Sequence, residues 1–183
     1  MGVVMRLHVV IVLLFSALLF TGCVAPMQHT YFVPNPEDGK PVRSSSCGFV
    51  DNNKEALERT FGELSVVVTP LYFGNGKLSL NFFLRHPSPV IFFDAKKVTV
   101  RESKKGVVLE PIDMRISSYG PDRSHPYTLS ITLSFSATSS EIDALVVSLG
   151  EGALIVDGHE IALAPFRFKQ STTTDLYYAS INC

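Results

Sequence analysis

Histidine and carboxylate side chains are the groups in this sequence that could hold a metal ion. His86 and His125 both precede a proline, which disfavours a helical conformation and places them in turns or extended loops. Loops at one end of a β-sandwich can converge. One hypothesis is therefore that these two histidines, together with Asp94 or Asp122, bind copper or zinc. The alternative is that both are solvated loop residues. We follow that alternative and predict no metal site.

Motifs for catalysis occur only as fragments. His159-Glu160 begins like the zinc-protease helix motif, but Leu163 stands where the second histidine should be, and the segment alternates like a strand. The sequence has no Gly-x-Ser-x-Gly elbow, no phosphate-cradling glycine-rich loop and no calcium loop of alternating acids. Because no nucleophile, base and orienting group can be assigned, we predict no catalytic residue and no cofactor.

Cys23 follows an apolar N-terminal segment. Basic Arg6 precedes an apolar run over residues 7–20, and two small residues, Thr21 and Gly22, separate that run from the cysteine. A basic start, an apolar stretch and small residues in this order are typical of an export signal. The run is about two-thirds of the roughly 20 residues that a spanning helix needs, so a permanent single-span anchor is the weaker alternative.

Residues 20–23, with the sequence Phe-Thr-Gly-Cys, resemble the lipobox of bacterial lipoproteins. The resemblance implies that residues 1–22 are removed as a signal peptide and that Cys23 takes a diacylglyceryl thioether and becomes the acylated first residue. Phe20 departs from the family pattern, which prefers leucine there. Val24 stands where an aspartate would retain such a protein in the inner membrane, so the resemblance points to the outer membrane, facing the periplasm.

Cys47 and Cys183 remain as an even pair once Cys23 carries lipid. Exported proteins meet an oxidising compartment, where such a pair is expected to form a disulfide. The bridge would close a loop over nearly the whole domain. In the chain-entropy model a disulfide that closes such a loop stabilises the fold by about 4 to 5 kcal/mol. Two free thiols are the alternative, and a redox role lacks the Cys-x-x-Cys pattern.

The mature chain divides into a tether and one domain. Residues 23–46 carry the lipidated cysteine, four prolines and a serine run, a composition typical of an extended tether, while Tyr31-Phe32-Val33 is an apolar cluster that we expect to dock on the domain. The domain is expected over residues 47–183. Removal of the signal leaves 15 basic against 17 acidic residues, which gives no basis for a nucleic-acid surface.

Alternation of apolar and polar residues dominates the chain after Phe61 and predicts β-strands. The alternation is clearest over residues 64–69, 78–85, 97–101 and 129–136. Shorter alternations occur at Met114 with Ile116, Leu145 with Val147 and Leu149, Ile161 with Leu163, and Phe166 with Phe168. One or two helical turns are expected near residues 51–59, where Asp51 or Asn52 can cap.

Turn residues favour antiparallel pairing of these strands. Asn75-Gly76 and Asp157-Gly158 each supply the positive-φ pair of a tight hairpin, and Lys104-Lys105-Gly106 supplies a third turn. Eight or nine short strands predict an all-β fold, an antiparallel two-sheet sandwich that is immunoglobulin-like in the broad sense. A sheet closed on itself is the alternative. The absence of tryptophan excludes an antibody-type core.

Four pairs of adjacent aromatic residues suggest a contact surface. Neighbouring residues on a strand face opposite ways, so one member of each pair is expected in the core and the other in solvent. The pairs are Tyr72-Phe73, Phe82-Phe83, Phe92-Phe93 and Tyr177-Tyr178. Exposed aromatics gathered on one face would mark a partner site.

Two classes of function fit these patterns. The first is a non-enzymatic binding or structural module, attached to the membrane through the lipid on Cys23 and contacting an envelope protein through a sheet edge or an apolar face. The second is a lipid-anchored hydrolase or metal-binding protein with a site built from loop histidines and carboxylates. We favour the first, because the residues assign no catalytic group, and fold alone does not decide between them.

Overall fold

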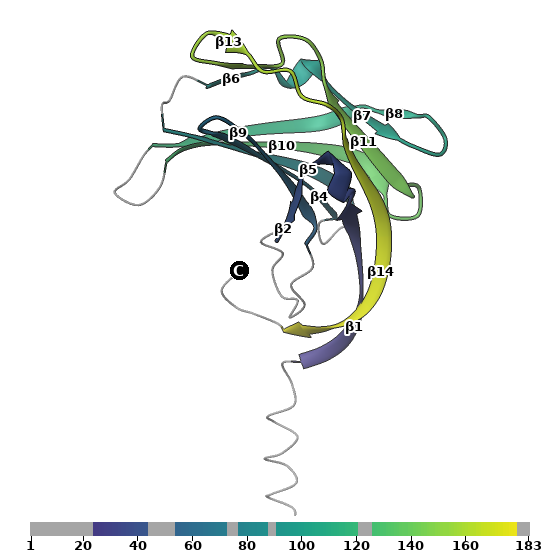
Figure 1. Cartoon of the computed structure of the whole chain (residues 1–183). Coiled ribbons are helices and arrows are strands. Elements are labelled where there is room, and N and C mark those ends of the chain that lie inside the picture. The colour runs from purple at the N-terminus through teal and green to yellow at the C-terminus, as the bar shows by residue number, and fades with distance from the viewer. Residues whose placement is uncertain (1–23, 44–53, 73–76, 88–90, 121–125, 179–183) are drawn as a thin grey trace, which may run out of the picture. The chain divides into compact units, whose positions relative to one another are not determined.

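The computed structural model describes residues 24–43, 54–72, 77–87, 91–120 and 126–178 (Figure 1). These residues fall into two compact parts. The larger part comprises the described residues from 30 to 172, and the smaller part comprises residues 24–29 and 173–178, the outer ends of β1 (Val24–Pro34) and β14 (Phe166–Tyr178). The packing described below lies within the larger part. No helix in the described ranges has the length and apolar character needed to cross a membrane.

The largest sheet has six antiparallel strands. Its order is β2 (Lys40–Val42), β3 (Ala56–Phe61), β4 (Leu64–Tyr72), β5 (Lys77–His86), β10 (Tyr127–Thr138) and β9 (Pro111–Tyr119). Strands β3, β4 and β5 are consecutive in the chain and pair as a meander. β10 lies between β5 and β9, so β2 and β9 are the two edges of this sheet.

A second sheet has five strands, and a third has three. The five-stranded order is β1, β14, β11 (Ala144–Leu149), β7 (Val98–Glu102) and β8 (Val108–Leu109). The three-stranded order is β13 (His159–Glu160), β12 (Leu154–Val156) and β6 (Ile91–Phe93). Two short 3-10 helices, η1 (Pro36–Asp38) and η2 (Ala95–Lys97), connect strands.

One hydrophobic core contains side chains from all three sheets. Phe82 of β5 packs on Phe93 of β6 with ring centroids 5.3 Å apart, and Phe32 of β1 packs on Tyr72 of β4 at 5.2 Å. Burial raises the pKa of Tyr72 above its ordinary value, and its hydroxyl donates a 2.6 Å hydrogen bond to Oε1 of Gln170 in β14. Contacts of this kind between sheets are what make the fold a sandwich.

The structure confirms the predicted all-β antiparallel class, and each sheet ends in edge strands instead of closing on itself. It has fourteen strands in the described ranges, more than the eight or nine expected, because several are only two or three residues long. The predicted Asp157-Gly158 turn joins β12 to β13 with both residues at positive φ. Gly106 likewise has a positive φ in the predicted turn between β7 and β8.

Three local expectations differ from the structure. The tether expected over residues 24–46 contains β1 and β2, because Phe32 is fully buried and β2 pairs with β3. The helical turns expected near residues 51–59 are wrong for residues 56–59, which belong to β3, since Leu57 is fully buried opposite Val68 of β4. Residues 161–165 form no strand, although Leu163 is buried.

Candidate binding surface at the edge of the sheet

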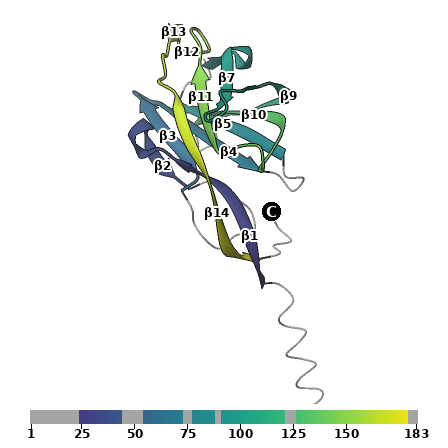
Figure 2. The same ribbon diagram turned by 90° about the vertical axis from the view of Figure 1, so that its right-hand side faces the viewer.

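β9 is a long edge strand that is exposed along its whole length. It pairs with β10 on one side, and no other strand in the described ranges pairs with it (Figure 2). All nine of its residues are exposed. Unpaired backbone N–H and C=O groups along such an edge are available to another chain.

The apolar side chains of β9 face the same way as the core. Met114 is opposite Leu133 of β10, and Ile116 is opposite Ile131, and directly paired residues share a face of the sheet. Ile131 and Leu133 are buried at 0% and 1% exposure, whereas Ile116 and Met114 are 51% and 47% exposed. The layer that covers β10 therefore stops before β9.

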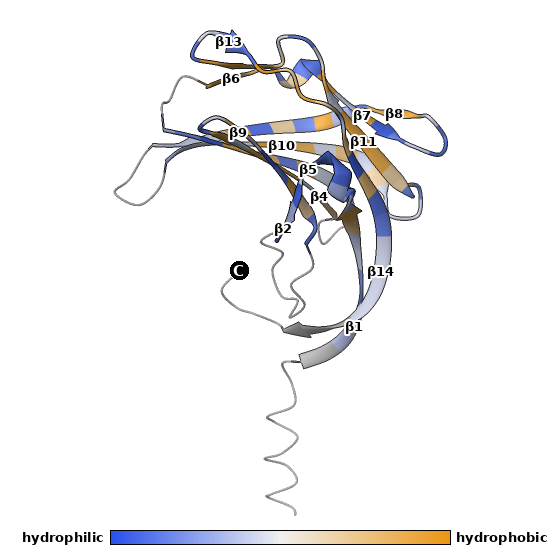
Figure 3. Ribbon diagram, in the orientation of Figure 1, coloured by the Kyte–Doolittle hydropathy of each residue, from blue (hydrophilic) through white to orange (hydrophobic). Residues whose placement is uncertain are grey.

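Ile112, which is 60% exposed, precedes this row at a register shift between β9 and β10. We call the exposed residues Ile112, Met114 and Ile116 the β9 ridge. Along β9, hydrophobic and hydrophilic residues alternate in Figure 3. Isolated exposed apolar residues are common, but three in a row beside an unpaired backbone edge are typical of a contact surface.

The opposite face of β9 carries charges. Asp113 and Arg115 lie two residues apart on this face, and Nε of Arg115 is 3.2 Å from Oδ2 of Asp113. The Arg115 side chain is 81% exposed and the Asp113 side chain 50% exposed, so this ion pair contributes little to the stability of the fold. Both side chains remain accessible to an incoming strand.

At the other edge of the same sheet, a carboxylate is enclosed by the fold. Asp38 of η1, next to β2, is buried and accepts hydrogen bonds from Nε and Nη2 of Arg167 in β14, at 2.9 and 2.5 Å. The backbone N–H of Arg167 also donates to Asp38, at 2.9 Å. The side-chain hydrogen bond from Arg167 is the main cause that holds the pKa of Asp38 below its usual value. The carboxylate is therefore charged at neutral pH.

Arg59 of β3 completes this group, which we call the Asp38 cluster. Its guanidinium donates to the backbone carbonyls of Asp38, Ala164 and Pro165 and lies 4.1 Å above the ring of Phe166. These contacts join η1, β3 and the start of β14. The charged groups of the Asp38 cluster thus have partners within the fold, and we assign them a structural role.

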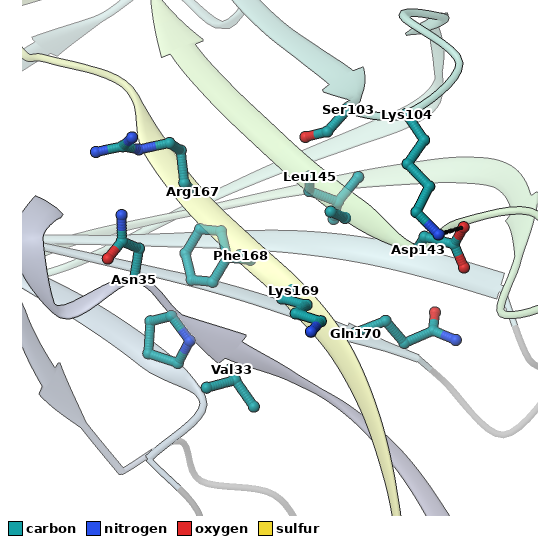
Figure 4. A pocket seen from close by; sticks show the side chains of 12 residues that line it. Val33, Asn35, Ser103, Lys104, Asp143, Leu145, Arg167, Phe168, Lys169 and Gln170 are labelled. Atoms are coloured by element: carbon teal, nitrogen blue, oxygen red, sulfur yellow. Dashed lines mark hydrogen bonds and ion pairs between the residues drawn. The ribbon is translucent and has the colours of Figure 1, made fainter.

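A groove of about 530 Å³ runs along β14 between the end of β1 and the β7–β8 turn (Figure 4). Several of its polar groups have partners within the protein. Lys104 Nζ is 2.7 Å from Oδ2 of Asp143, Arg167 binds Asp38, and Gln170 both accepts from Tyr72 and donates to Ser139 O. Lys104, Arg167 and Gln170 are thus held by contacts within the fold.

The histidines singled out in the sequence do not form a metal site in the described ranges. His86 is buried, and its Nε2 lies 4.0 Å from Oδ2 of Asp157 in the β12–β13 turn. Asp94 accepts the N–H of Lys96 and caps η2. His159 is exposed on β13. No group of three or more His, Cys, Asp or Glu side chains is placed to bind a metal there, and His125 and Asp122 lie outside the described residues.

The three cysteines also lie outside the described residues, so the lipidation of Cys23 and the Cys47–Cys183 bridge stay predictions. Among the aromatic pairs, Phe93 is buried and Phe92 is 57% exposed, as expected for neighbours on a strand. Phe82 is fully buried and Phe83 partly so. Phe73 lies in an undescribed segment, as do the side chains of Tyr177 and Tyr178.

The sequence predicted only part of the β9 ridge. Alternation at Met114 and Ile116 predicted a strand, but nothing in the pattern indicated that its apolar face would be uncovered. Comparison of the chain with known protein families, curated proteins and solved structures found no match.

Proposed function

We propose that this chain is a lipid-anchored protein of the cell envelope whose β-sandwich acts as a non-enzymatic binding or structural module. The lipobox resemblance supports an anchor on Cys23, with the outer membrane, facing the periplasm, as the favoured location. The observation that carries the binding role is the β9 edge, where nine exposed residues combine an unpaired backbone with the β9 ridge. The contact is addition of a strand to the sheet.

An anchor of this kind makes a modest edge contact effective. Each buried methylene of an acyl chain contributes about 0.8 kcal/mol, so two or three chains hold the protein at the membrane. Confinement near another anchored protein raises the effective concentration to roughly millimolar. An edge interaction that would be weak in dilute solution then suffices.

Metabolic labelling with a fatty acid tests the anchor. The full chain is expected to incorporate the label and Cys23→Ala to lose it, whereas undiminished label on the variant would contradict the assignment. Mass mapping without reduction should also find Cys47 joined to Cys183. Two thiols open to alkylation in the native protein would refute the bridge.

In-cell chemical cross-linking of the full chain tests the binding role. The triple variant Ile112→Ser, Met114→Ser, Ile116→Ser is expected to lose cross-linked species that the unsubstituted chain forms. Phe92→Ser removes one exposed apolar side chain from another sheet and serves as the matched control, expected to keep those species. If the triple variant gives the same species in the same yield, β9 is not the contact surface.

A further inference from the structure

We infer that the partner of β9 is β9 of a second copy of this chain, paired antiparallel about a two-fold axis beside Met114. The inference rests on the proposed role of β9 as a contact edge and names its occupant. Most soluble oligomers are closed and symmetric, and a two-fold interface requires a surface that complements itself. β9 carries such a pattern.

The residues from 112 to 116 read Ile-Asp-Met-Arg-Ile, with the two charges of opposite sign placed symmetrically about Met114. An antiparallel second copy centred on Met114 sets Asp113 opposite Arg115 of that copy, and Arg115 opposite its Asp113. In the same register Met114 meets Met114, and Ile116 meets Ile112, which is the extra residue at the register shift between β9 and β10. Each charge thus faces its opposite, and each apolar residue faces an apolar residue.

Neighbouring registers lack this match. A two-fold axis at Asp113 would set two aspartates opposite each other, and an axis at Arg115 would set two arginines opposite each other, which is unfavourable for directly paired residues. An axis at Ile116 avoids like charges, but it pairs Arg115 with Ser117 and Met114 with Ser118. This register forms no pair of opposite charges, and it sets Met114 beside a polar side chain. Charge complementarity therefore selects the axis at Met114.

The geometry of the sheet permits the pairing. β9 is the last strand of its sheet in the described ranges, so two copies would join their six-stranded sheets into one continuous sheet and satisfy both exposed edges. The two β9 ridges would then form one apolar strip across the junction. Asp113 and Arg115 already interact within one strand, and pairing would build a square of four alternating charges on the other face.

Cysteine cross-linking of the full chain in membranes tests the register. Two copies of the Met114→Cys chain should cross-link to each other through the introduced cysteine. The Ile112→Cys chain should cross-link to a co-expressed Ile116→Cys chain. Ser118→Cys is the matched control on the same face of β9. In this register the two copies of position 118 are eight strand positions apart, about 26 Å, and should not cross-link. The unsubstituted chain gives the background from its own cysteines, and mass mapping identifies the joined peptide.

Charge reversal tests whether the partner is a second copy. In the Met114→Cys background, Asp113→Arg should lower the cross-link yield by about tenfold, because the arginine introduced at position 113 of each copy then faces Arg115 of the other. Adding Arg115→Asp should restore the yield to within about threefold of its starting value, since the double reversal recreates opposite pairs. Both side chains are exposed, so thermal unfolding of these variants in dilute protein should match that of the parent.

Restoration by the double reversal supports self-pairing, because a foreign partner would keep its original charges. Cross-linking at Ser118 in place of Met114, or a double reversal that stays as low as the single one, overturns the two-fold register. If those results coincide with loss of cross-linked species in the triple serine variant, β9 binds something other than itself and only this inference fails. If the triple variant is also unchanged, the proposed function fails with it.

Discussion

The two edges of the six-stranded sheet are built in opposite ways. β2 has three residues, one of them Pro41, and lies next to the Asp38 cluster, which ties η1, β3 and β14 together. β9 has nine residues, no proline after its first position, and a row of uncovered apolar side chains. Both edges carry an acid and an arginine, but Asp38 is buried while Asp113 and Arg115 are exposed.

This difference separates charges that hold the fold from charges that are available for contact. Natural proteins protect sheet edges with short strands, prolines and covering segments, and β2 has the first two of these features. β9 has a proline and a register shift against β10 only at its start, and residues 113–119 pair with β10 without interruption. A long edge that is apolar on one face favours aggregation unless it has a partner, so its form points to an interface.

The largest expected effect is at the closed edge, from Asp38→Ala. The substitution removes the carboxylate that accepts hydrogen bonds from the guanidinium and the backbone N–H of Arg167. Loss of charge-assisted hydrogen bonds at a buried carboxylate should lower the free energy of unfolding by about 2 kcal/mol. Chemical denaturation of the full chain measures it.

Asp143→Ala is the matched control, since it removes an ion pair with Lys104 in which both side chains are largely exposed. It should leave the denaturation midpoint unchanged. Equal losses in both variants would contradict the contrast between enclosed and exposed charges.

Gly39→Ala should give the next largest effect, also beside β2. Gly39 has a φ of 154°, and a Cβ built there would lie 2.7 Å from the backbone oxygen of Glu58. Because η1 or β3 must shift to admit the methyl group, we expect a loss of about 1 to 2 kcal/mol in thermal or chemical unfolding. Gly62→Ala has open space around its Cβ, so it isolates the cost of a positive φ, and it should be the milder change.

The sequence predicted the positions of the strands better than it predicted which strands lie side by side in a sheet. Alternation over residues 64–69, 78–85 and 129–136 identified strands whose apolar faces are buried, because period-two patterning is a local signal. The edge position of β9 depends on the order of strands in the sheet, which local patterning does not contain. Asp38 and Arg167 are 129 residues apart, so their pairing had no local signal either.

Helix propensity over residues 54–59 was overridden by pairing. Gly62, with a φ of 55°, turns the chain between β3 and β4, and the hairpin then buries Leu57 against β4. Propensity is a weak prior against such burial. The tether expectation was wrong for residues 24–34 and 40–42, because composition did not reveal that they form β1 and β2. The expected docking of Tyr31-Phe32-Val33 agrees with the burial of Phe32.

Acidification should weaken the closed edge. The pKa of Asp38 is lowered in the folded protein, chiefly by the side-chain hydrogen bond from Arg167, so the unfolded chain binds a proton more readily. The stabilisation is present in full above the unfolded pKa, near 3.8, and is lost as pH falls through the lower folded pKa. The stability difference between the parent chain and Asp38→Asn should therefore shrink between about pH 5 and pH 2. A difference that stays constant over this range would contradict a charged Asp38 bound by Arg167.

The smallest effect on folding is expected at the open edge, from Ile116→Thr. Ile116 is 51% exposed although it is opposite Ile131, which is fully buried, so the substitution removes little packing and keeps a β-branched residue in the strand. In dilute protein the free energy of unfolding should change by less than about 0.5 kcal/mol.

If β9 pairs with a second copy, the free energy of unfolding of the parent chain rises with its concentration, because association favours the folded state. The rise should be smaller for Ile116→Thr. Unfolding followed at two concentrations a hundredfold apart measures both quantities on the same samples. A large loss in the dilute sample would mean that the β9 ridge belongs to the core of a single chain, and the contrast between the two edges would then be wrong.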